Sequence, residues 1–205
     1  MPAGRPREFD PDRCLDIAMQ EFWRRGYDST SVGDLADAMG IGRQSLYNTF
    51  GDKREIFLAA VQRYGEAREQ ECSRILLEST SALDAVRRLM SKAVEPAACS
   101  GCLVGNALPR FAAVDADLSA VLRREMQRPQ RVLRSWLSLA RDAGELDARA
   151  DIDAMARDLT VLMSGLIMQA MVDGDSTRAE PSLRVVDLLL SDAARTTSVE
   201  PPLQA

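Results

Sequence analysis

The sequence predicts an all-α protein, and three observations support this fold class. Ala, Leu, Arg, Asp and Met dominate the 205 residues, and runs of Val, Ile and Thr are scarce. Aromatic residues make up only 5% of the chain. Apolar residues recur at spacings of three and four, which is the period of an amphipathic helix. The length suits one large domain or two small ones with a sizeable core.

The first predicted helix follows the Pro/Gly-rich segment MPAGRPRE. Asp10 suits the N-cap of this helix, and Pro11 suits its first helical position. Gly26 ends the helix. One face of the helix carries four apolar residues at helical spacing, namely Leu15, Ala18, Met19 and Phe22.

Two short helices and a long one are predicted next. Ser31 and Asp34 form a capping-box pattern at the start of the second helix, and Gly40 ends that helix. The third helix covers residues 43–49. The fourth runs from Lys53 or Arg54 to about residue 77 after a break at Gly51-Asp52.

The chain becomes more apolar after the Ser/Thr-rich stretch at 79–81. Pro109 either kinks a helix or starts a new one. Pro129 should kink its helix, because it lacks a backbone donor and clashes with the preceding turn. The helices predicted in this part cover residues 82–95, 103–112, 116–143, 151–173 and 181–194.

The second and third helices have the spacing of a helix-turn-helix, joined by the turn MGIG. Gly40 permits a positive φ, Ile41 anchors the turn in the core, and the small Ala36 lets the helices approach. With Leu46 and Phe50 directed inward, six side chains remain outside: Arg43, Gln44, Ser45, Tyr47, Asn48 and Thr49. Such donors and acceptors suit base edges and phosphates.

An ordinary solvated helix could carry the same polar face. Two neighbouring features favour DNA binding instead. Arg5 and Arg7 lie on an N-terminal arm, and Lys53 follows Gly51-Asp52 at a helix start, where a phosphate can meet free N–H groups. The overall net charge of −5 and pI of about 5.0 do not indicate nucleic-acid binding, so any such site must be local.

The composition also excludes several classes of function. The chain contains no histidine, which removes Ser-His and Cys-His catalysis and His-ligated zinc. No export signal is visible at the N-terminus. The longest apolar run, at 161–172, is too short to span a bilayer. We therefore expect a cytoplasmic protein with no membrane partner, no metal and no cofactor.

Residues 13–57 resemble the DNA-binding domain of TetR-type (TetR/AcrR) transcriptional regulators. The resemblance runs through the following positions: Ala18, Phe22, Gly26, Tyr27, Thr30, Ser31, Leu35, Ala36, Met39, Gly40, Ile41, Leu46, Tyr47, Phe50, Lys53 and Phe57. It implies a non-enzymatic homodimer that binds a near-palindromic DNA operator. Most members of this family are repressors that a small-molecule inducer releases, so an inducer of unknown identity is expected here.

The resemblance also implies a domain organisation. Residues 1–52 would form the DNA-binding domain with its arm, and residues 53–78 would form a connecting helix. Residues 79–195 would form the ligand-binding and dimerisation domain. Independently of the resemblance, the segment TTSVEPPLQA at 196–205 is expected to be a disordered tail.

The resemblance assigns roles to particular residues of the DNA-binding part. Arg43 and Gln44 are expected to read bases. Phosphate contacts are expected from Thr30 or Ser31, from Tyr47 and from Lys53. The full expected set is Arg5, Arg7, Thr30, Ser31, Gly42, Arg43, Gln44, Ser45, Tyr47, Asn48 and Lys53. Gly42 stands where the family often has Ser or Thr, which removes one hydroxyl. Asn48-Thr49 replaces a common aromatic or histidine pair.

Cys99 and Cys102 form a C-x-x-C pair with three possible roles. The pair can be structural, it can be a thiol that responds to oxidants or electrophiles, or it can supply half of a zinc site. Metal binding is the weakest reading, because no second pair and no histidine complete the site. A small thiol-redox enzyme is the competing class, but no thioredoxin-like βαβ pattern surrounds the pair.

Two further sets of residues are candidates in the second half of the chain. Asn106 and Arg110 lie among apolar residues, where they serve either as a cap or as polar anchors of a ligand pocket. The pocket candidates are Met90, Val94, Asn106, Arg110, Trp136, Met163 and Ile167. The last two helices carry apolar stripes that suit a four-helix dimer interface. Its candidates are Leu159, Gly165, Leu166, Leu183, Val186 and Leu190.

Overall fold

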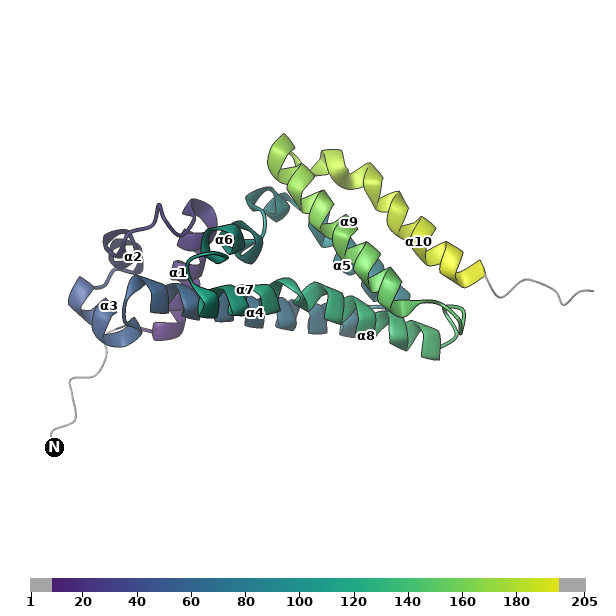
Figure 1. Cartoon of the computed structure of the whole chain (residues 1–205), viewed down its shortest axis with the longest axis horizontal. Helices are drawn as coiled ribbons and strands as arrows, with labels where there is room; N and C mark the ends of the chain where they lie inside the picture. The colour runs from purple at the N-terminus through teal and green to yellow at the C-terminus, as the bar shows by residue number, and fades with distance from the viewer. Residues whose placement is uncertain (1–8, 196–205) are drawn as a thin grey trace, which may run out of the picture. The chain divides into compact units, whose positions relative to one another are not determined.

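The computed structural model describes residues 9–195, except for the side chains of residues 97, 98, 179, 192, 194 and 195. All regular elements in the described residues are helices, which confirms the predicted fold class (Figure 1). The chain forms two compact units. The N-terminal unit consists of Met1–Glu69 and Cys102–Glu125, and the C-terminal unit of Gln70–Gly101 and Met126–Ala205. The predicted arm with Arg5 and Arg7 and the tail at 196–205 lie outside the described residues.

The local signals at the first two helices act as predicted. The Asp10 side chain accepts hydrogen bonds from the N–H groups of the first turn, and Ser31 and Asp34 form the capping box. Gly40 ends its helix with a left-handed φ of 68°. The helices of this unit are α1 (Pro11–Arg25), α2 (Val32–Met39), α3 (Arg43–Phe50), the first part of α4 (Lys53–Glu78), α6 (Leu103–Phe111) and most of α7 (Ala116–Met126).

An aromatic cluster holds the N-terminal unit together. Phe57 of α4 lies edge-on to Phe22 of α1, with ring centroids 5.0 Å apart. The ring centroid of Tyr27, which follows α1, lies 4.8 Å from that of Phe111 of α6. Such aromatic contacts add to the free energy gained by burying the rings. Helix α6 therefore packs with the helix-turn-helix in one unit, although the sequence order assigned it to a separate domain beginning at residue 79.

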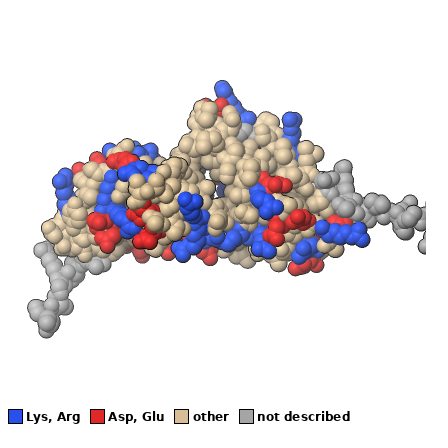
Figure 2. All heavy atoms as spheres, viewed as in Figure 1, with Lys and Arg blue, Asp and Glu red and all other residues tan. Residues whose placement is uncertain are grey.

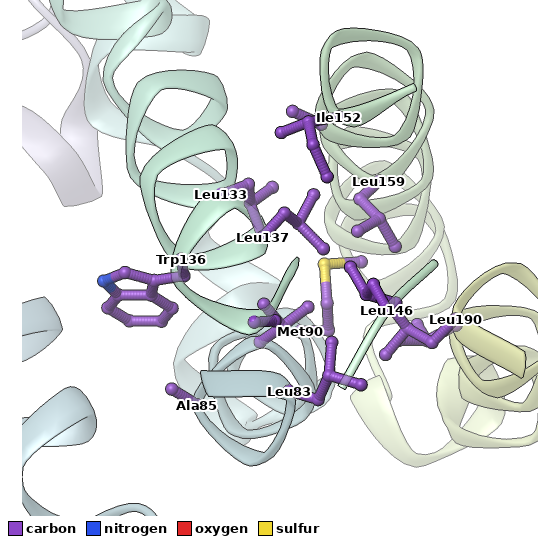
Figure 3. Close-up of a cluster of buried hydrophobic side chains, with 14 of the residues drawn as sticks. Leu83, Ala85, Met90, Leu133, Trp136, Leu137, Leu146, Ile152, Leu159 and Leu190 are labelled. Atoms are coloured by element: carbon purple, nitrogen blue, oxygen red, sulfur yellow. The ribbon is translucent and has the colours of Figure 1, made fainter. Parts of the chain in front are cut away.

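The C-terminal unit is built around α8 (Arg128–Asp142) and α9 (Ile152–Asp173). Its hydrophobic core includes Met90, Leu137 and Leu159, and Figure 3 shows the Met90 side chain directed between Leu137 and Leu146. The other elements of the unit are α5 (Ala82–Ser91), η1 (Lys92–Val94), η2 (Pro96–Ser100), η3 (Ser176–Leu183), α10 (Arg184–Arg195) and the end of α4.

Pro129 acts differently from the prediction. The helix predicted at 116–143 is two helices, because α7 ends at Met126 and Pro129 lies in the first turn of α8. Proline is tolerated there because the first N–H groups of a helix have no intrahelical partner. Helix α6 continues through Pro109 to Phe111. The predicted helices 82–95 and 181–194 are shorter in α form, since 3₁₀ turns replace the end of the first and the start of the second.

Helix α9 closely matches the predicted helix 151–173, and it extends beyond the apolar run at 161–172. By length and composition alone its 22 residues could cross a membrane, and it is the one such helix in the part of the chain that the structure describes. Its buried residues, which include Ile152, Ala156 and Leu159, lie in the hydrophobic core of the C-terminal unit. Core helices of globular proteins have the same composition.

Candidate DNA-binding surface

Helix α3 exposes the polar face that its sequence predicted. Leu46 is fully buried and holds α3 against the unit. Around it, five side chains of the predicted set are exposed: Arg43, Gln44, Ser45, Tyr47 and Asn48. Tyr47 keeps 47% of its surface in solvent, although it is a large aromatic residue. Such exposure of donors, acceptors and one aromatic ring on a short helix leaves them free to contact a partner.

Two of these side chains are joined to each other. The Gln44 side-chain amide donates a hydrogen bond from Nε2 to Asn48 Oδ1 at 2.9 Å. The two residues lie one helical turn apart, so their side chains are neighbours on the α3 surface. The bond orients both amides and leaves Gln44 Oε1 and the Asn48 amino group able to face a ligand.

The start of α3 has no side-chain cap. Gly42 occupies the N-cap with a φ of −68° and makes no side-chain hydrogen bond. A Cβ atom built on Gly42 would meet no atom within 4 Å. The first N–H groups of a helix carry partial positive charge, and an anion can bind them. The α3 N-terminus is therefore an open donor site, and the exposed side chains of Arg43 and Gln44 lie at the same end of the helix.

Ser31 and Thr30 differ in their availability. Thr30 is fully buried and its hydroxyl donates a 2.8 Å hydrogen bond to the Gly26 carbonyl, so the predicted phosphate contact of Thr30 is wrong. Ser31 is exposed, but its hydroxyl donates to Asp34 Oδ2 at 2.6 Å within the capping box. That bond, with a further one from the Ser31 N–H, holds the pKa of Asp34 below its usual value.

Lys53 is half-buried rather than fully extended into solvent. Its Nζ lies 4.3 Å from the centroid of the Tyr27 ring and 3.5 Å from the Asp28 carbonyl oxygen. Burial lowers the pKa of Lys53. The ammonium is thus held at the turn after α1 by a cation–π contact, where it adds a positive charge beside the helix-turn-helix.

Charge is mixed on the face of the molecule that Figure 2 shows. Figure 2 shows Lys and Arg interspersed with Asp and Glu on the visible face, without one continuous basic patch. This agrees with the negative net charge of the chain. The candidate surface is therefore local to α3, to the first turn of α2 and to Lys53.

Sequence reasoning missed the role of Arg110. It was a pocket candidate, but it is exposed, and its Nε donates to Asp28 Oδ2 at 2.8 Å within the N-terminal unit. Asn106, the other polar candidate on α6, is also exposed. No sequence signal could have paired residues 82 positions apart, since their proximity depends on the packing of α6 against the helix-turn-helix.

The remaining pocket candidates belong to the C-terminal unit. Met90 and Trp136 are buried in its core, and Val94, Met163 and Ile167 pack against that core. As packed, these side chains contact protein. An open hollow of about 710 Å³ in the same unit has different lining residues, among them Met155, Asp158, Val185 and Leu188. None of the pocket candidates lines this hollow.

The dimer candidates also face inward for the most part. Leu159, Leu166, Val186 and Leu190 are buried in the core of their own chain, because α10 packs its apolar stripe within the C-terminal unit. Leu183 is partly buried there. Gly165 is exposed, and a Cβ atom on it would meet nothing within 4 Å. Its exposed apolar neighbours on α9 are Val161, Met168 and Val172.

Cys102 occupies the N-cap of α6 in the N-terminal unit. Its sulfur accepts a hydrogen bond from the Gly105 N–H at 3.5 Å and one from the Tyr64 hydroxyl at 3.6 Å. Burial raises the pKa of Tyr64, so this hydroxyl keeps its proton and acts as a donor. The Arg68 guanidinium lies 5.1 Å from the centroid of the Tyr64 ring. Cys99 is a half-buried free thiol in η2 of the C-terminal unit.

The sequence matches two described families over most of its length. Residues 15–60 match "Bacterial regulatory proteins, tetR family", and residues 80–186 match "Tetracyclin repressor-like, C-terminal domain". The chain is 33% identical to YezE of Bacillus subtilis, described as an uncharacterized HTH-type transcriptional regulator, over 90% of this chain and all of YezE. It is 30% identical to the HTH-type transcriptional repressor ComR of Escherichia coli, over 82% of each chain.

A solved structure agrees with these sequence matches. The TetR family regulator CifR, crystallised as a cysteine mutant with a 26-bp double-strand operator DNA, is 31% identical to this chain. The two folds superpose with a TM-score of 0.75, covering 92% of this chain and 98% of CifR.

An all-helical fold with an N-terminal helix-turn-helix and an exposed polar recognition helix defines a DNA-binding transcriptional regulator. The chain belongs to the TetR family of such regulators, whose members are not enzymes. The predicted resemblance is therefore confirmed.

Proposed function

We propose that this protein is a transcriptional repressor that binds a near-palindromic DNA operator as a homodimer and leaves it when an inducer binds. The observation that carries the proposal is the exposed polar face of α3 with its uncapped N-terminus. The 30% identity to the repressor ComR and the 31% identity to CifR, which was crystallised with operator DNA, support it. Such a protein acts in the cytoplasm, where the DNA is.

The side chains on α3 match the chemistry of the major groove. Arginine binds guanine O6 and N7 with two hydrogen bonds, and glutamine or asparagine binds adenine N6 and N7 in the same way. In this proposal Arg43 and Gln44 read bases, with Asn48 orienting Gln44 through their 2.9 Å hydrogen bond. Tyr47, Lys53 and the free N–H groups after Gly42 contact phosphates, which set the register of the helix on the duplex.

The exposed apolar face of α9 supports a homodimer. Val161, Gly165, Met168 and Val172 recur at the spacing of one helix face, and all four are exposed in the single chain. A second copy that packs on this face would bury the three apolar side chains, and the glycine would let the helix backbones approach closely. Two copies of α3 then have to enter successive major grooves about 34–36 Å apart.

Fluorescence anisotropy tests the DNA-binding proposal. The probe is a labelled duplex that the wild-type protein selects from a random-sequence library. Arg43→Ala or Gln44→Ala should relax sequence preference by about 1–3 kcal/mol per lost bidentate contact. Lys53→Ala should weaken binding to all DNA sequences alike, and it should make affinity depend less steeply on salt concentration.

Arg74→Ala is the matched control, because Arg74 is an exposed arginine on the part of α4 in the C-terminal unit. This variant should bind the duplex like wild type. If Arg43→Ala left affinity and sequence selectivity unchanged, α3 would not be the reader.

The inducer is best sought by thermal stabilisation. A ligand present at 100 times its dissociation constant adds about 2.7 kcal/mol to the free energy of unfolding. Compounds that raise the melting temperature should also release the selected duplex if they are inducers. A compound that stabilises the protein but does not release the duplex is not an inducer.

Thiol chemistry at Cys102 is the second candidate signal, and the hydrogen bond from Tyr64 favours it. The Tyr64 hydroxyl and the Gly105 N–H hold the sulfur at the N-cap of α6, so a group added to the sulfur would displace both donors. Modification of Cys102 would disturb the start of α6, whose other end contacts Asp28 through Arg110. In this reading an oxidant or electrophile lowers DNA affinity.

A further inference from the structure

The Arg43 side chain turns back from α3 onto the first turn of α2. There it lies against Gly33. A Cβ atom built on Gly33 would be 2.6 Å from Arg43 Nη2 and 3.3 Å from Arg43 Cζ. A carbon atom needs about 3.5 Å from a neighbouring heavy atom at optimal packing. The guanidinium therefore occupies space that any side chain at residue 33 would take.

Nothing in the backbone explains a glycine at this position. Gly33 is the second residue of α2, and it is not among the glycines with positive φ. Glycine lowers helix stability relative to alanine at such a site. Of the atoms nearest to the missing Cβ, the two closest belong to Arg43 and the third is Ser31 Oγ at 3.4 Å.

The contact restricts a side chain that would otherwise be free. Arg43 is exposed, and its side chain makes no hydrogen bond or ion pair with another residue within 9–195. An unrestrained arginine side chain loses rotational freedom about several bonds when it binds, and this loss of conformational entropy reduces affinity. Contact with the open surface at Gly33 limits the directions that the guanidinium can take before DNA arrives.

We propose that Gly33 is a positioning residue for Arg43: its missing side chain leaves the surface on which the guanidinium lies, and so sets the direction from which Arg43 meets DNA. This inference rests on the proposed role of Arg43 as a DNA reader. It adds a residue of α2 to the determinants of affinity and selectivity, although that residue has no side chain to contact a base.

The test is Gly33→Ala, measured with the selected duplex by fluorescence anisotropy and with circular dichroism for thermal unfolding. The added Cβ displaces the guanidinium, so DNA affinity should fall three- to ten-fold. The melting temperature should stay the same or rise, because alanine favours the helix. A purely structural role of Gly33 would instead lower the melting temperature together with DNA binding.

Ala38→Gly is the matched control, since it exchanges the same two residue types on α2 at an exposed position five residues further along. It should lower the melting temperature and leave DNA affinity within two-fold of wild type. A comparable loss of affinity in this control would overturn the inference, because DNA affinity would then respond to any substitution on α2 rather than to the position of the Arg43 guanidinium.

A double-mutant cycle separates the inference from the proposed function. In an Arg43→Ala background, Gly33→Ala should cause no further loss of affinity. An equal loss in both backgrounds would overturn the positioning role, because the Cβ would then obstruct DNA directly. Unchanged binding by Gly33→Ala, while Arg43→Ala weakens it, would overturn the inference alone. Unchanged binding by Arg43→Ala would overturn the proposed reader and this inference with it.

Discussion

Arg110 of α6 donates a hydrogen bond from Nε to Asp28 Oδ2 at 2.8 Å, in the turn between α1 and α2. Phe111, the residue after Arg110, and Tyr27, the residue before Asp28, are also in contact, with their ring centroids 4.8 Å apart. An ion pair and an aromatic pair thus join α6 to the helix-turn-helix. These two contacts can transmit a displacement of α6 to the DNA-binding helices.

The aromatic pair should contribute far more to stability than the ion pair. Phe111 is only 4% exposed, and its replacement by Ala should cost about 3–5 kcal/mol through the cavity that it leaves. The side chains of Arg110 and Asp28 are 47% and 63% exposed, so the coupling from a double-mutant cycle should be below about 1 kcal/mol. Urea denaturation measures both. A coupling near that of a buried pair would show that the turn shields this contact from water.

The ion pair between Arg54 and Asp115 should make stability depend on acid pH. Arg54 donates two hydrogen bonds to the carboxylate, from Nε at 2.5 Å and from Nη2 at 2.9 Å. They lower the pKa of Asp115 to about 2. This folded-state pKa lies below the unfolded value of about 3.9. The ion pair therefore makes its full contribution to the stability of the folded state above about pH 4. This contribution is lost as the pH falls towards 2.

The variant Asp115→Asn lacks this titration. Its melting temperature should lie below that of wild type at pH 6, and the difference should shrink as the pH falls from about 4 to about 2. Ala38→Gly, which changes no titratable group at an exposed position of α2, is the control and should keep a constant difference. A constant difference for Asp115→Asn as well would mean that the pair does not shift this carboxyl group.

The outer face of α9 should be the dimer contact. Val161 is 68% exposed in the single chain, so Val161→Asp should fold normally but place a charge in the proposed interface. Light scattering should report monomers, and DNA binding should be lost. Val186→Asp should instead unfold the chain, because Val186 is only 3% exposed within its own core. A folded Val161→Asp dimer would rule out this face.

The cysteines should react with maleimide in a defined order. Cys14 is 3% exposed and burial raises its pKa, so it should react last. Tyr64→Phe removes the hydroxyl that donates to Cys102, and it should slow labelling of Cys102 several-fold at constant pH. Peptide mass spectrometry measures each rate, with Cys99 as the internal control. An unchanged Cys102 rate would show that the Tyr64 hydrogen bond does not activate this thiol.

The local features of the helix-turn-helix could be predicted because they depend on neighbours in the chain. The caps at Asp10 and Ser31, the left-handed Gly40 and the burial of Leu46 all agree with the expectations. The exposure of the α3 polar face follows from the same short-range pattern. Residues that interact within one helix or turn are three or four positions apart, so their spacing can be recognised in the sequence.

The sequence pattern identified the apolar residues of the last two helices but not the partner that each face meets. Leu159 and Val186 pack inside their own chain, whereas Val161 of the same apolar helix remains outside. Hydrophobicity drives burial without direction, so an apolar stripe fits an intrachain core or an interface equally well.

Contacts between distant segments likewise required the folded chain. The sequence established most of the helices, the caps of the first two and the exposed polar face of α3. The pairing of Arg110 with Asp28, the place of α6 beside the helix-turn-helix and the contact of Arg43 with Gly33 became visible only in the packed structure. The physical reason is that short-range hydrogen bonds and spacings specify a helix, whereas the choice of neighbour depends on how all the buried surfaces fit together at once.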